Sequence, residues 1–261
     1  MSGRMQLVDV SFNRGNRPII QSVNLTLQSG QFIGMIGPNG TGKSTLLRLM
    51  ARLLKPDKGF IELNEKRLKD LSDIEVAKII TYMPQSTILE YQFTVEQVVL
   101  MGRHPHRKRW QGTQREDLRI TDRAMELTGI THLKKRFITT LSGGERQLVF
   151  LARSIAQQSQ VILLDEPTSD LDIYHQVQIC KAIKSLVEEG KTVVAAIHDI
   201  NLAARYCDRI LLLDRGSIIG ADEPGRILTT ENILRVFQTN AYTFKDPYLE
   251  KQNLIPYAVQ E

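Results

Sequence analysis

The segment GPNGTGKST at residues 37–45 constrains the fold more than any other part of the chain. It has the spacing G-x-x-x-x-G-K-[ST], and it lies directly between the apolar run FIGMI and a helical pattern. Glycines let backbone N–H groups turn inward around a phosphate, and a helix N-terminus adds its dipole. The segment therefore predicts a nucleotide phosphate site rather than a plain glycine-rich turn. The residues of this site are Gly37, Pro38, Asn39, Gly40, Thr41, Gly42, Lys43, Ser44 and Thr45.

Short apolar runs alternate with helical patterns along most of the chain, which predicts an α/β fold with a mainly parallel sheet. Strands are expected at residues 32–36, 79–83, 161–164, 193–197 and 210–213. Helices are expected at residues 43–54, at 173–189 with Gly190 as the stop, and at 200–207. Residues 93–158 hold no run of strand type, and Ile120, Ala124 and Leu127 fall on one helix face, so a helical insertion is expected there. Residues 245–261 are interpreted as an edge strand or a loosely held tail.

Composition excludes several classes of protein. With 42% hydrophobic and 24% charged residues, the 261-residue chain has the composition of a globular protein, not of a disordered or fibrous one. A net charge of +5 is too small to indicate nucleic acid as a partner. We expect neither a signal peptide nor a membrane span, because no apolar run is long enough. Cys180 and Cys207 lack metal-ligand spacing and are expected to be buried residues in a reducing compartment.

The apolar run VILLDE at residues 161–166 ends in two carboxylates. A buried strand that ends in Asp165 can hold Mg²⁺ beside the phosphate loop, and Glu166 then occupies the place of a general base for an attacking water. The alternative is that both side chains only cap the turn at Pro167. The neighbouring phosphate loop favours the catalytic interpretation.

A second anion site is predicted by the segment LSGGERQ at residues 141–147, since Ser142, Gly143 and Gly144 open a helical pattern that continues to Ala156. Only the first loop has a lysine, and a single triphosphate cannot obviously occupy both loops.

With LSGGERQ in place, the sequence resembles the ATPase subunit of an ABC transporter from about Leu7 to Phe237. This resemblance implies a P-loop NTPase (RecA-like) core, an N-terminal antiparallel β part and an inserted α-helical subdomain. It places the nucleotide-binding domain at residues 1–240, with the helical subdomain at about 93–158, and a C-terminal tail at 241–261.

The resemblance also implies roles for individual residues. Gln85 in YMPQ is similar to the Q-loop glutamine that touches Mg²⁺, and His198 in AIHDI to the switch histidine that contacts the γ-phosphate. The expected catalytic residues are thus Glu166, His198 and Gln85, and the expected Mg²⁺ ligands are Ser44, Gln85 and Asp165. Ser142, Gly143 and Gly144 would bind the ATP of a second copy. Residues 169–172 resemble the D-loop, with Asp170 where the family often has alanine.

The adenine contact stays open. The family usually has an aromatic residue near the start of the chain, where this sequence offers Phe12 with Arg14 close by. Either Phe12 stacks on the base, or Arg14 packs on the Phe12 ring. Alternatively, Phe12 is an ordinary strand residue that faces the core.

Three further stretches, MGRHPH, DIYHQV and HDINLAARYCDRI, are similar to the ATPases of bacterial importers for ferric siderophores, haem and cobalamin. We expect import of a ferric siderophore or haem first, and of cobalamin or another metal chelate second. The implied partners are an integral-membrane permease in two copies or as a dimer, a second copy of this chain bound head to tail, and an external substrate-binding protein. The chain would lie peripherally on the cytoplasmic face of the membrane.

Two rival functions use the same phosphate loop. An ABC ATPase acting on nucleic acid or ribosomes usually carries two ATPase units or a long coiled-coil insertion, and this chain has neither. The second rival, a stand-alone kinase that phosphorylates a small acceptor, does not need a signature loop such as LSGGERQ that acts on a second copy.

The basic segment at residues 103–110, with Trp110, invites a nucleic-acid interpretation, but a solvated loop on the helical insertion is preferred. His104 and His106 alone make an incomplete metal site.

Overall fold

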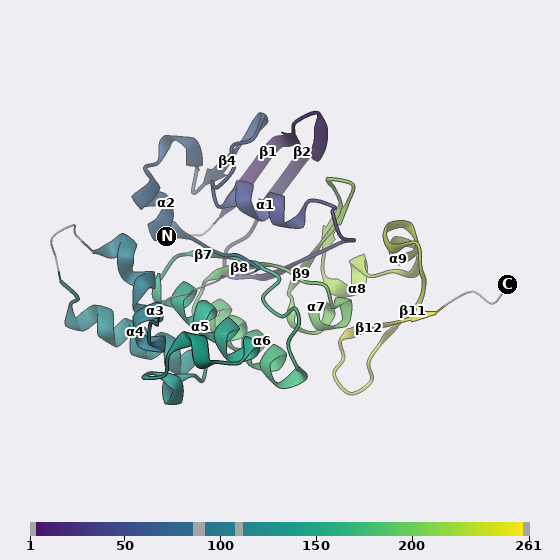
Figure 1. The fold of residues 1–261 in the computed structure, drawn as a ribbon. Coiled ribbons are helices and arrows are strands. Elements are labelled where there is room, and N and C mark those ends of the chain that lie inside the picture. The colour runs from purple at the N-terminus through teal and green to yellow at the C-terminus, as the bar shows by residue number, and fades with distance from the viewer. Residues whose placement is uncertain (1–3, 86–91, 108–111, 258–261) are drawn as a thin grey trace.

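The computed structural model of the chain describes residues 4–85, 92–107 and 112–257. A six-stranded sheet with the strand order β10-β9-β3-β8-β7-β6 forms its centre (Figure 1). Its strands are β3 (Phe32–Ile36), β6 (Ile80–Met83), β7 (Val161–Asp165), β8 (Thr192–Ala196), β9 (Arg209–Asp214) and β10 (Ser217–Asp222). The five parallel strands are the five predicted ones, so the α/β class is confirmed. The sixth, β10, is antiparallel to β9 and only half-buried, and its sequence carries no comparable apolar run.

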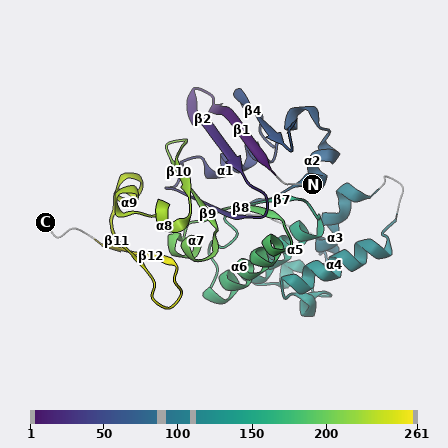
Figure 2. The same ribbon diagram turned by 180° about the vertical axis from the view of Figure 1, so that it is seen from behind.

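Helices cover both faces of this sheet (Figures 1 and 2). On one face lies α1 (Lys43–Met50), and on the other lie α5 (Gly143–Ala156), α6 (Ile173–Glu188) and α7 (Ile200–Tyr206). Residues that alternate along β7 belong to different cores: Leu163 joins the cluster that contains α1, and Leu164 joins the cluster that contains α5 and α6. This two-sided burial explains why the strands are apolar throughout their length.

The N-terminal part is a separate antiparallel sheet above α1, with the strand order β2-β1-β4-β5 (Figure 1). It consists of β1 (Met5–Arg14), β2 (Arg17–Leu27), β4 (Lys58–Leu63) and β5 (Lys66–Arg67), and is followed by the 3-10 helix η1 (Leu68–Asp70) and by α2 (Asp73–Ile79). Its buried residues, such as Met5 and Leu7, share one core with α1. The antiparallel part implied by the family resemblance is therefore present.

The regular elements described between β6 and β7 are helices, apart from an isolated antiparallel bridge between Thr94 and Phe137. This segment contains α3 (Val95–Leu100), the 3-10 helices η2 (Met101–His106), η3 (Thr131–Leu133) and η4 (Ile138–Thr140), α4 (Arg115–Leu127) and α5. Ile120 and Ala124 are buried on the inner face of α4, and Leu127 packs against the same core, as their spacing predicts. Within the ranges described, no helix is both long and apolar enough to cross a membrane.

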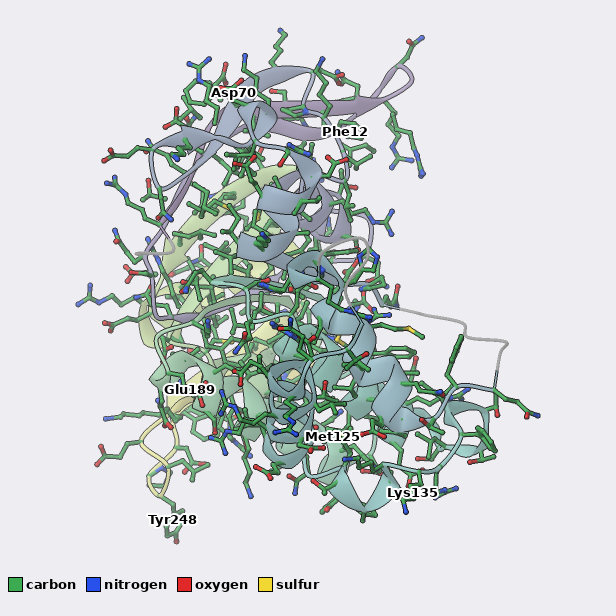
Figure 3. The ribbon with its side chains drawn as sticks, turned by 90° about the vertical axis from the view of Figure 1, so that its left-hand side faces the viewer. Phe12, Asp70, Met125, Lys135, Glu189 and Tyr248 are labelled. Atoms are coloured by element: carbon green, nitrogen blue, oxygen red, sulfur yellow. The ribbon has the colours of Figure 1, made fainter. Side chains whose placement is uncertain are left out.

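The C-terminal part contains the short helices α8 (Pro224–Ile227) and α9 (Thr230–Phe237), followed by a hairpin of β11 (Asn240–Lys245) and β12 (Gln252–Tyr257). Of the two interpretations of residues 245–261, the described part contains a strand: β12 pairs with β11 in a sheet of two strands, separate from the main sheet. The hairpin is tied to α7: the Asn201 amide donates to the Leu254 carbonyl at 3.1 Å and accepts from the Leu254 N–H at 2.9 Å. Tyr248 lies exposed at the hairpin tip, at the opposite end of the molecule from Phe12 (Figure 3).

Both cysteines are unpaired and buried, as predicted. Burial raises the pKa of the Cys180 thiol to about 12 and places that of Cys207 well above its ordinary value. The Cys207 sulfur lies against Gly34 of β3, where an added Cβ would come within 2.7 Å of it. Both residues therefore fill the core as small apolar groups.

Candidate functional site

The loop at residues 37–45 connects β3 to the N-terminus of α1, as its spacing predicts. No side chain caps α1, so the backbone N–H groups of its first turn are left for an anion. Gly42 precedes the helix at a φ of 101°, and a Cβ there would lie 2.9 Å from the Ile19 carbonyl oxygen. Glycine is thus required at this position by both backbone conformation and space.

Lys43 is buried under this loop, and its ammonium donates to the carbonyl oxygens of Gly37 at 2.7 Å and Pro38 at 3.0 Å. Burial lowers the pKa of Lys43, while the nearby carboxylates of Glu166 and Asp165 act in the opposite direction. The lysine is therefore a cation that the loop's own carbonyls hold in position at the start of α1.

Asp165 at the end of β7 is buried and accepts two hydrogen bonds from hydroxyl groups. Ser44 Oγ of α1 donates to Asp165 Oδ1 at 2.8 Å, and the Tyr82 hydroxyl of β6 donates to Oδ2 at 2.9 Å. Arg48 Nε in turn donates to the Tyr82 hydroxyl at 3.2 Å. Three elements thus converge on one carboxylate.

Tyr82 and Arg48 are residues of this site that the motif analysis did not identify. Their only sequence signals are weak: Tyr82 lies three residues before Gln85 on a strand beside β7, and Arg48 lies one helical turn after Ser44. Burial raises the pKa of the Tyr82 hydroxyl above its ordinary value. Tyr82 therefore remains a protonated donor to Asp165 at neutral pH.

Glu166, the next residue, lies between the other two expected catalytic side chains. Gln85 Nε2 donates to Glu166 Oε2 at 2.6 Å, and His198 Nε2 lies 2.5 Å from Oε1. The Glu166 side chain is only 12% exposed, and its backbone has a φ of 54°. Since the oxygens of Asp165 and Glu166 contact groups from other elements, the alternative that they only cap the turn at Pro167 is wrong.

A cavity of about 420 Å³ opens beside Glu166. Gln85, Ser169, Asp170 and His198 line it together with Glu166. The residues predicted as the Q-loop, the D-loop and the switch histidine thus meet in one place, although they are distant in sequence.

The donor atoms at this site suit a hard cation. Ser44, Asp165 and Gln85 offer hydroxyl, carboxylate and amide oxygens, the ligand types that Mg²⁺ prefers, and the Ser44 and Asp165 oxygens are already adjacent. The described part of the chain contains no group of three or more His, Cys, Asp or Glu side chains that could hold a metal. His106 instead contacts the Gln157 carbonyl oxygen at 2.8 Å through Nε2.

The second predicted anion loop is not part of this site within one chain. Ser142 caps α5 and accepts from the Glu145 N–H at 3.2 Å, and the Glu145 carboxylate accepts from the Ser142 N–H at 2.8 Å. This helix lies on the opposite face of the sheet from α1 (Figure 1). The described residues that line the cavity beside Glu166 do not include Ser142, Gly143 or Gly144.

The two residues considered for the adenine contact, Phe12 and Arg14, differ in their burial. Phe12 is half-buried against the core beneath the antiparallel sheet, and Arg14 is exposed. Across the ranges described, the stacked arginine–aromatic pairs are Arg67 with Phe60 and Arg153 with Phe150, so Arg14 does not cover the Phe12 ring. A base contact by either residue stays a prediction.

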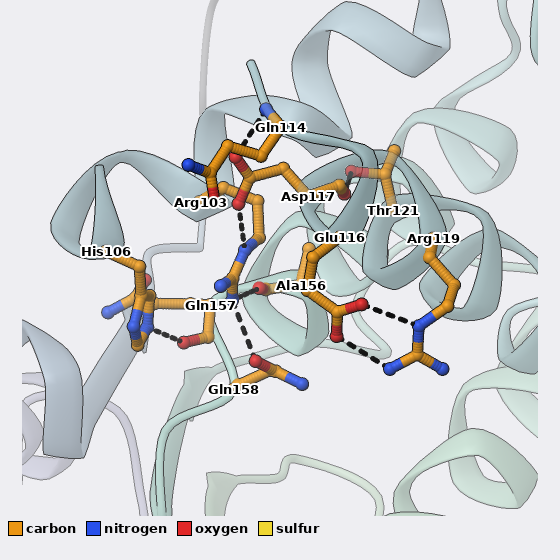
Figure 4. A network of polar contacts seen from close by, with 10 residues as sticks. All are labelled: Arg103, His106, Gln114, Glu116, Asp117, Arg119, Thr121, Ala156, Gln157 and Gln158. Atoms are coloured by element: carbon orange, nitrogen blue, oxygen red, sulfur yellow. Dashed lines mark hydrogen bonds and ion pairs between the residues drawn. The ribbon is translucent and has the colours of Figure 1, made fainter. Parts of the chain in front are cut away.

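The expectation of a solvated basic loop at residues 103–110 is wrong for its first residue. Arg103 is buried, its Nε donates to Asp117 at 3.1 Å, and its Nη1 donates to the Ala156 carbonyl at 2.8 Å and to Gln158 at 3.0 Å (Figure 4). Burial acts to raise the pKa of Asp117, but the hydrogen bonds from the Gln114 N–H and from Arg103 outweigh it and leave the pKa lowered. Residues 108–110, Trp110 included, lie outside the described residues.

Comparison with known protein families gives a match over more than half of the chain. The family model for the ABC transporter matches residues 20–169. The cobalamin import ATP-binding protein of Halobacterium salinarum is 42% identical over 88% of this chain. This chain spans 57% of the length of that relative. The petrobactin import ATP-binding protein of Bacillus anthracis is 41% identical over 87% of this chain and 84% of its own length. The hemin import ATP-binding protein of Pseudomonas aeruginosa is 39% identical, with 93% and 96% covered.

Two solved structures are similar over most of the chain. A metal-chelate type ABC transporter in an inward-facing conformation superimposes with a TM-score of 0.86 at 30% identity, covering 99% of this chain and 98% of that chain. A bacterial ABC transporter cassette solved as a dimer has a TM-score of 0.74 at 30% identity, covering 84% of this chain and 98% of that one.

Proposed function

Since the chain belongs to the ABC transporter family, we propose that it is the ATP-hydrolysing subunit of an importer for a ferric siderophore or haem. The observation that carries the proposal is the bridge made by Glu166, whose two oxygens contact Gln85 and His198 beside the buried Lys43 and Asp165. A general base and two polar groups that orient it are the requirements for hydrolysis of a bound triphosphate.

The loop at residues 37–45 binds the phosphates of ATP. Backbone N–H groups of the loop and of the first turn of α1 receive the phosphate oxygens, and Lys43 supplies the cation to the β- and γ-phosphates. Mg²⁺, held by Ser44, Asp165 and Gln85, would neutralise charge on the same phosphates.

Glu166 accepts a proton from water as the water oxygen attacks the γ-phosphorus, and the bond from that phosphorus to the bridging oxygen breaks. Gln85 and His198 hold the Glu166 carboxylate from opposite oxygens, which fixes the direction in which it accepts the proton. His198 is 38% exposed and lines the same cavity, so its ring is accessible to the γ-phosphate.

The active unit is a head-to-tail pair of chains in which Ser142, Gly143 and Gly144 of one copy close over the ATP of the other. Two findings support this arrangement. The signature loop and the phosphate loop lie on opposite faces of the sheet within one chain, and a cassette of similar fold has been solved as a dimer.

The pair works with an integral-membrane permease, present in two copies or as a dimer, and an external binding protein delivers the substrate to that permease. The chain would thus lie peripherally on the cytoplasmic face of the membrane. Two relatives named for import of petrobactin and hemin support an iron-containing substrate. The relative named for cobalamin import makes cobalamin the second candidate.

Replacing Glu166 by Gln tests the proposal. Loss of the general base should lower ATP turnover by about 10²- to 10⁴-fold, while ATP binding to the purified protein, measured by equilibrium dialysis, stays the same. Glu188→Gln, at an exposed glutamate near the end of α6, is the matched control and should retain full turnover. Undiminished turnover in Glu166→Gln would exclude Glu166 as the base.

The same variant tests the substrate in cells. A strain that carries only Glu166→Gln should fail to grow when a ferric siderophore or haem is the sole iron source, and grow normally on an excess of ferrous iron. Loss of cobalamin-dependent growth alone would instead select the second candidate. Co-purification of the chain with ribosomes rather than a permease would reject both.

A further inference from the structure

We propose that His175 is a positioning residue that fixes the second glycine of the signature loop, Gly144, in the place where it meets a second copy's ATP. This inference rests on the proposed function, because it concerns the loop that closes the partner's site. It is carried by contacts between the start of α6 and the start of α5, which no motif connects.

The imidazole of His175 occupies the space in front of Gly144. Gly144 is buried, and a Cβ built on it would lie 2.6 Å from Cγ of His175 and 2.7 Å from Cδ2 and Nδ1. A Cβ on the neighbouring Gly143 would meet no atom within 4 Å. Of the two adjacent glycines, only Gly144 is therefore required by a contact inside its own chain.

The ring that touches Gly144 is itself held by Asp172. The Asp172 carboxylate caps α6 by accepting the backbone N–H of His175 at 2.9 Å, and both of its oxygens lie 2.9 Å from His175 Nδ1. Because an ionised carboxylate only accepts hydrogen bonds, Nδ1 carries the proton in this arrangement. The backbone N–H of His175, followed by its side chain, holds the pKa of Asp172 below its ordinary value.

One more contact and the burial of the side chain restrict the ring. The Tyr174 ring meets it edge-on with the centroids 5.3 Å apart, and the His175 side chain is only 18% exposed. The ring cannot swing away without losing its bond to Asp172. A methyl group at position 144 would thus displace the start of α5 rather than the histidine.

The physical consequence is a mutual constraint between two segments. Gly144 must lack a side chain because the ring lies there, and the ring sets how closely the N-terminus of α5 approaches α6. A reacting or binding group misplaced by about 1 Å loses on the order of 10²-fold in activity. The His175 ring therefore contributes to ATP-dependent pairing although it is not part of the phosphate loop.

A suppression experiment in the Glu166→Gln background tests this. The readout is the ATP concentration that half-saturates dimer formation, followed by light scattering. Gly144→Ala should raise that concentration on the order of 10²-fold, and His175→Ala about 10-fold. The double variant should need less ATP than Gly144→Ala alone, because the alanine methyl occupies the space that the ring has left.

Controls separate positioning from folding. ATP binding by the single chain should not change in His175→Ala, since His175 belongs neither to the phosphate loop nor to the described residues that line the cavity beside Glu166. His104→Ala, at an exposed histidine of η2, should pair like the parent. If His175→Ala fails to fold, His175→Ser replaces it, because serine has no atoms corresponding to the Cδ2 and Nδ1 atoms that meet Gly144.

The outcomes are distinct. Unchanged pairing in His175→Ala overturns the inference, and so does a double variant as defective as Gly144→Ala, because glycine would then be needed only for approach of the partner's phosphate. If Glu166→Gln with an intact His175 never pairs in ATP, the proposed function itself fails.

Discussion

Asp165 accepts a hydrogen bond from a hydroxyl group on each of its two oxygens, one from Ser44 and one from Tyr82. A partner that does not bind the metal itself, as Tyr82 is here, orients a ligating carboxylate, and its loss typically lowers metal affinity. The Tyr82 hydroxyl is protonated at neutral pH, and burial raises its pKa still further above the ordinary value. The residue thus orients Asp165 from β6, the strand next to β7.

We therefore predict that Tyr82→Phe raises the Mg²⁺ concentration for half-maximal ATP turnover by about 10- to 100-fold, while turnover at saturating Mg²⁺ stays near that of the parent. The measurement is a Mg²⁺ titration of steady-state turnover. Tyr257→Phe, at an exposed tyrosine of β12, is the control. An unchanged titration curve would mean that Tyr82 does not orient Asp165.

Single residues differ in how far sequence reveals them. Glu166, Gln85 and His198 could be named because each lies in a short motif, and these motifs follow one another in a fixed order. Tyr82 and Arg103 could not, since their partners Asp165 and Asp117 lie in other elements and no local pattern marks the pair. The contact between Gly144 and His175 is of the same kind: each residue lies in a segment of its own, and only the fold brings the segments together.

At the scale of elements, Arg103 joins three pieces of the helical part. From η2 it reaches Asp117 at the start of α4 and the Ala156 carbonyl at the end of α5 (Figure 4). Its side chain is 6% exposed and that of Asp117 8% exposed. A buried charge left without its partner destabilises a protein more than loss of the whole pair does.

Arg103→Leu should thus lower the free energy of unfolding by about 3–5 kcal/mol, and adding Asp117→Leu should restore part of this loss. Urea denaturation followed by circular dichroism measures both. Arg119→Ala removes an exposed ion pair to Glu116 on the same helix and should leave the midpoint unchanged. A double variant that is less stable than Arg103→Leu alone contradicts this account.

How well a helix or strand can be predicted from the sequence depends on how deeply its residues are buried. Strands covered on both faces carry continuous apolar runs, so β3, β6, β7, β8 and β9 were predicted within one or two residues. Helix α1 ends at Met50 rather than at residue 54, because the chain turns at Arg52, which has a φ of 57°. The strands β10, β11 and β12 carry mostly half-buried or exposed residues without a continuous apolar run, and each is held by a hairpin pairing with its neighbour in sequence.

At the scale of the whole molecule, the two anion loops precede helices that lie on opposite faces of the sheet. One chain offers a phosphate loop on the α1 side of the sheet and a signature loop on the α5 side (Figure 2). Phosphoryl transfer depends on positioning and on stabilisation of charge, so in the proposed pair a triphosphate bound at the first loop alone would lack the contacts of the second loop.

Turnover per chain should therefore rise with protein concentration and reach a plateau once pairs dominate. Light scattering on the same samples gives the fraction of pairs, which should follow turnover. The prediction fails if turnover per chain is constant over a range in which the scattering mass is that of one chain.

The two hydrogen bonds between Asn201 and Leu254 have a mechanical consequence. They join β12 to α7, a helix that starts two residues after His198, so the hairpin of β11 and β12 is connected to His198 through one helix. A displacement of the hairpin would therefore be transmitted through α7 to His198. A fluorescent dye attached to the hairpin would report movements of that histidine.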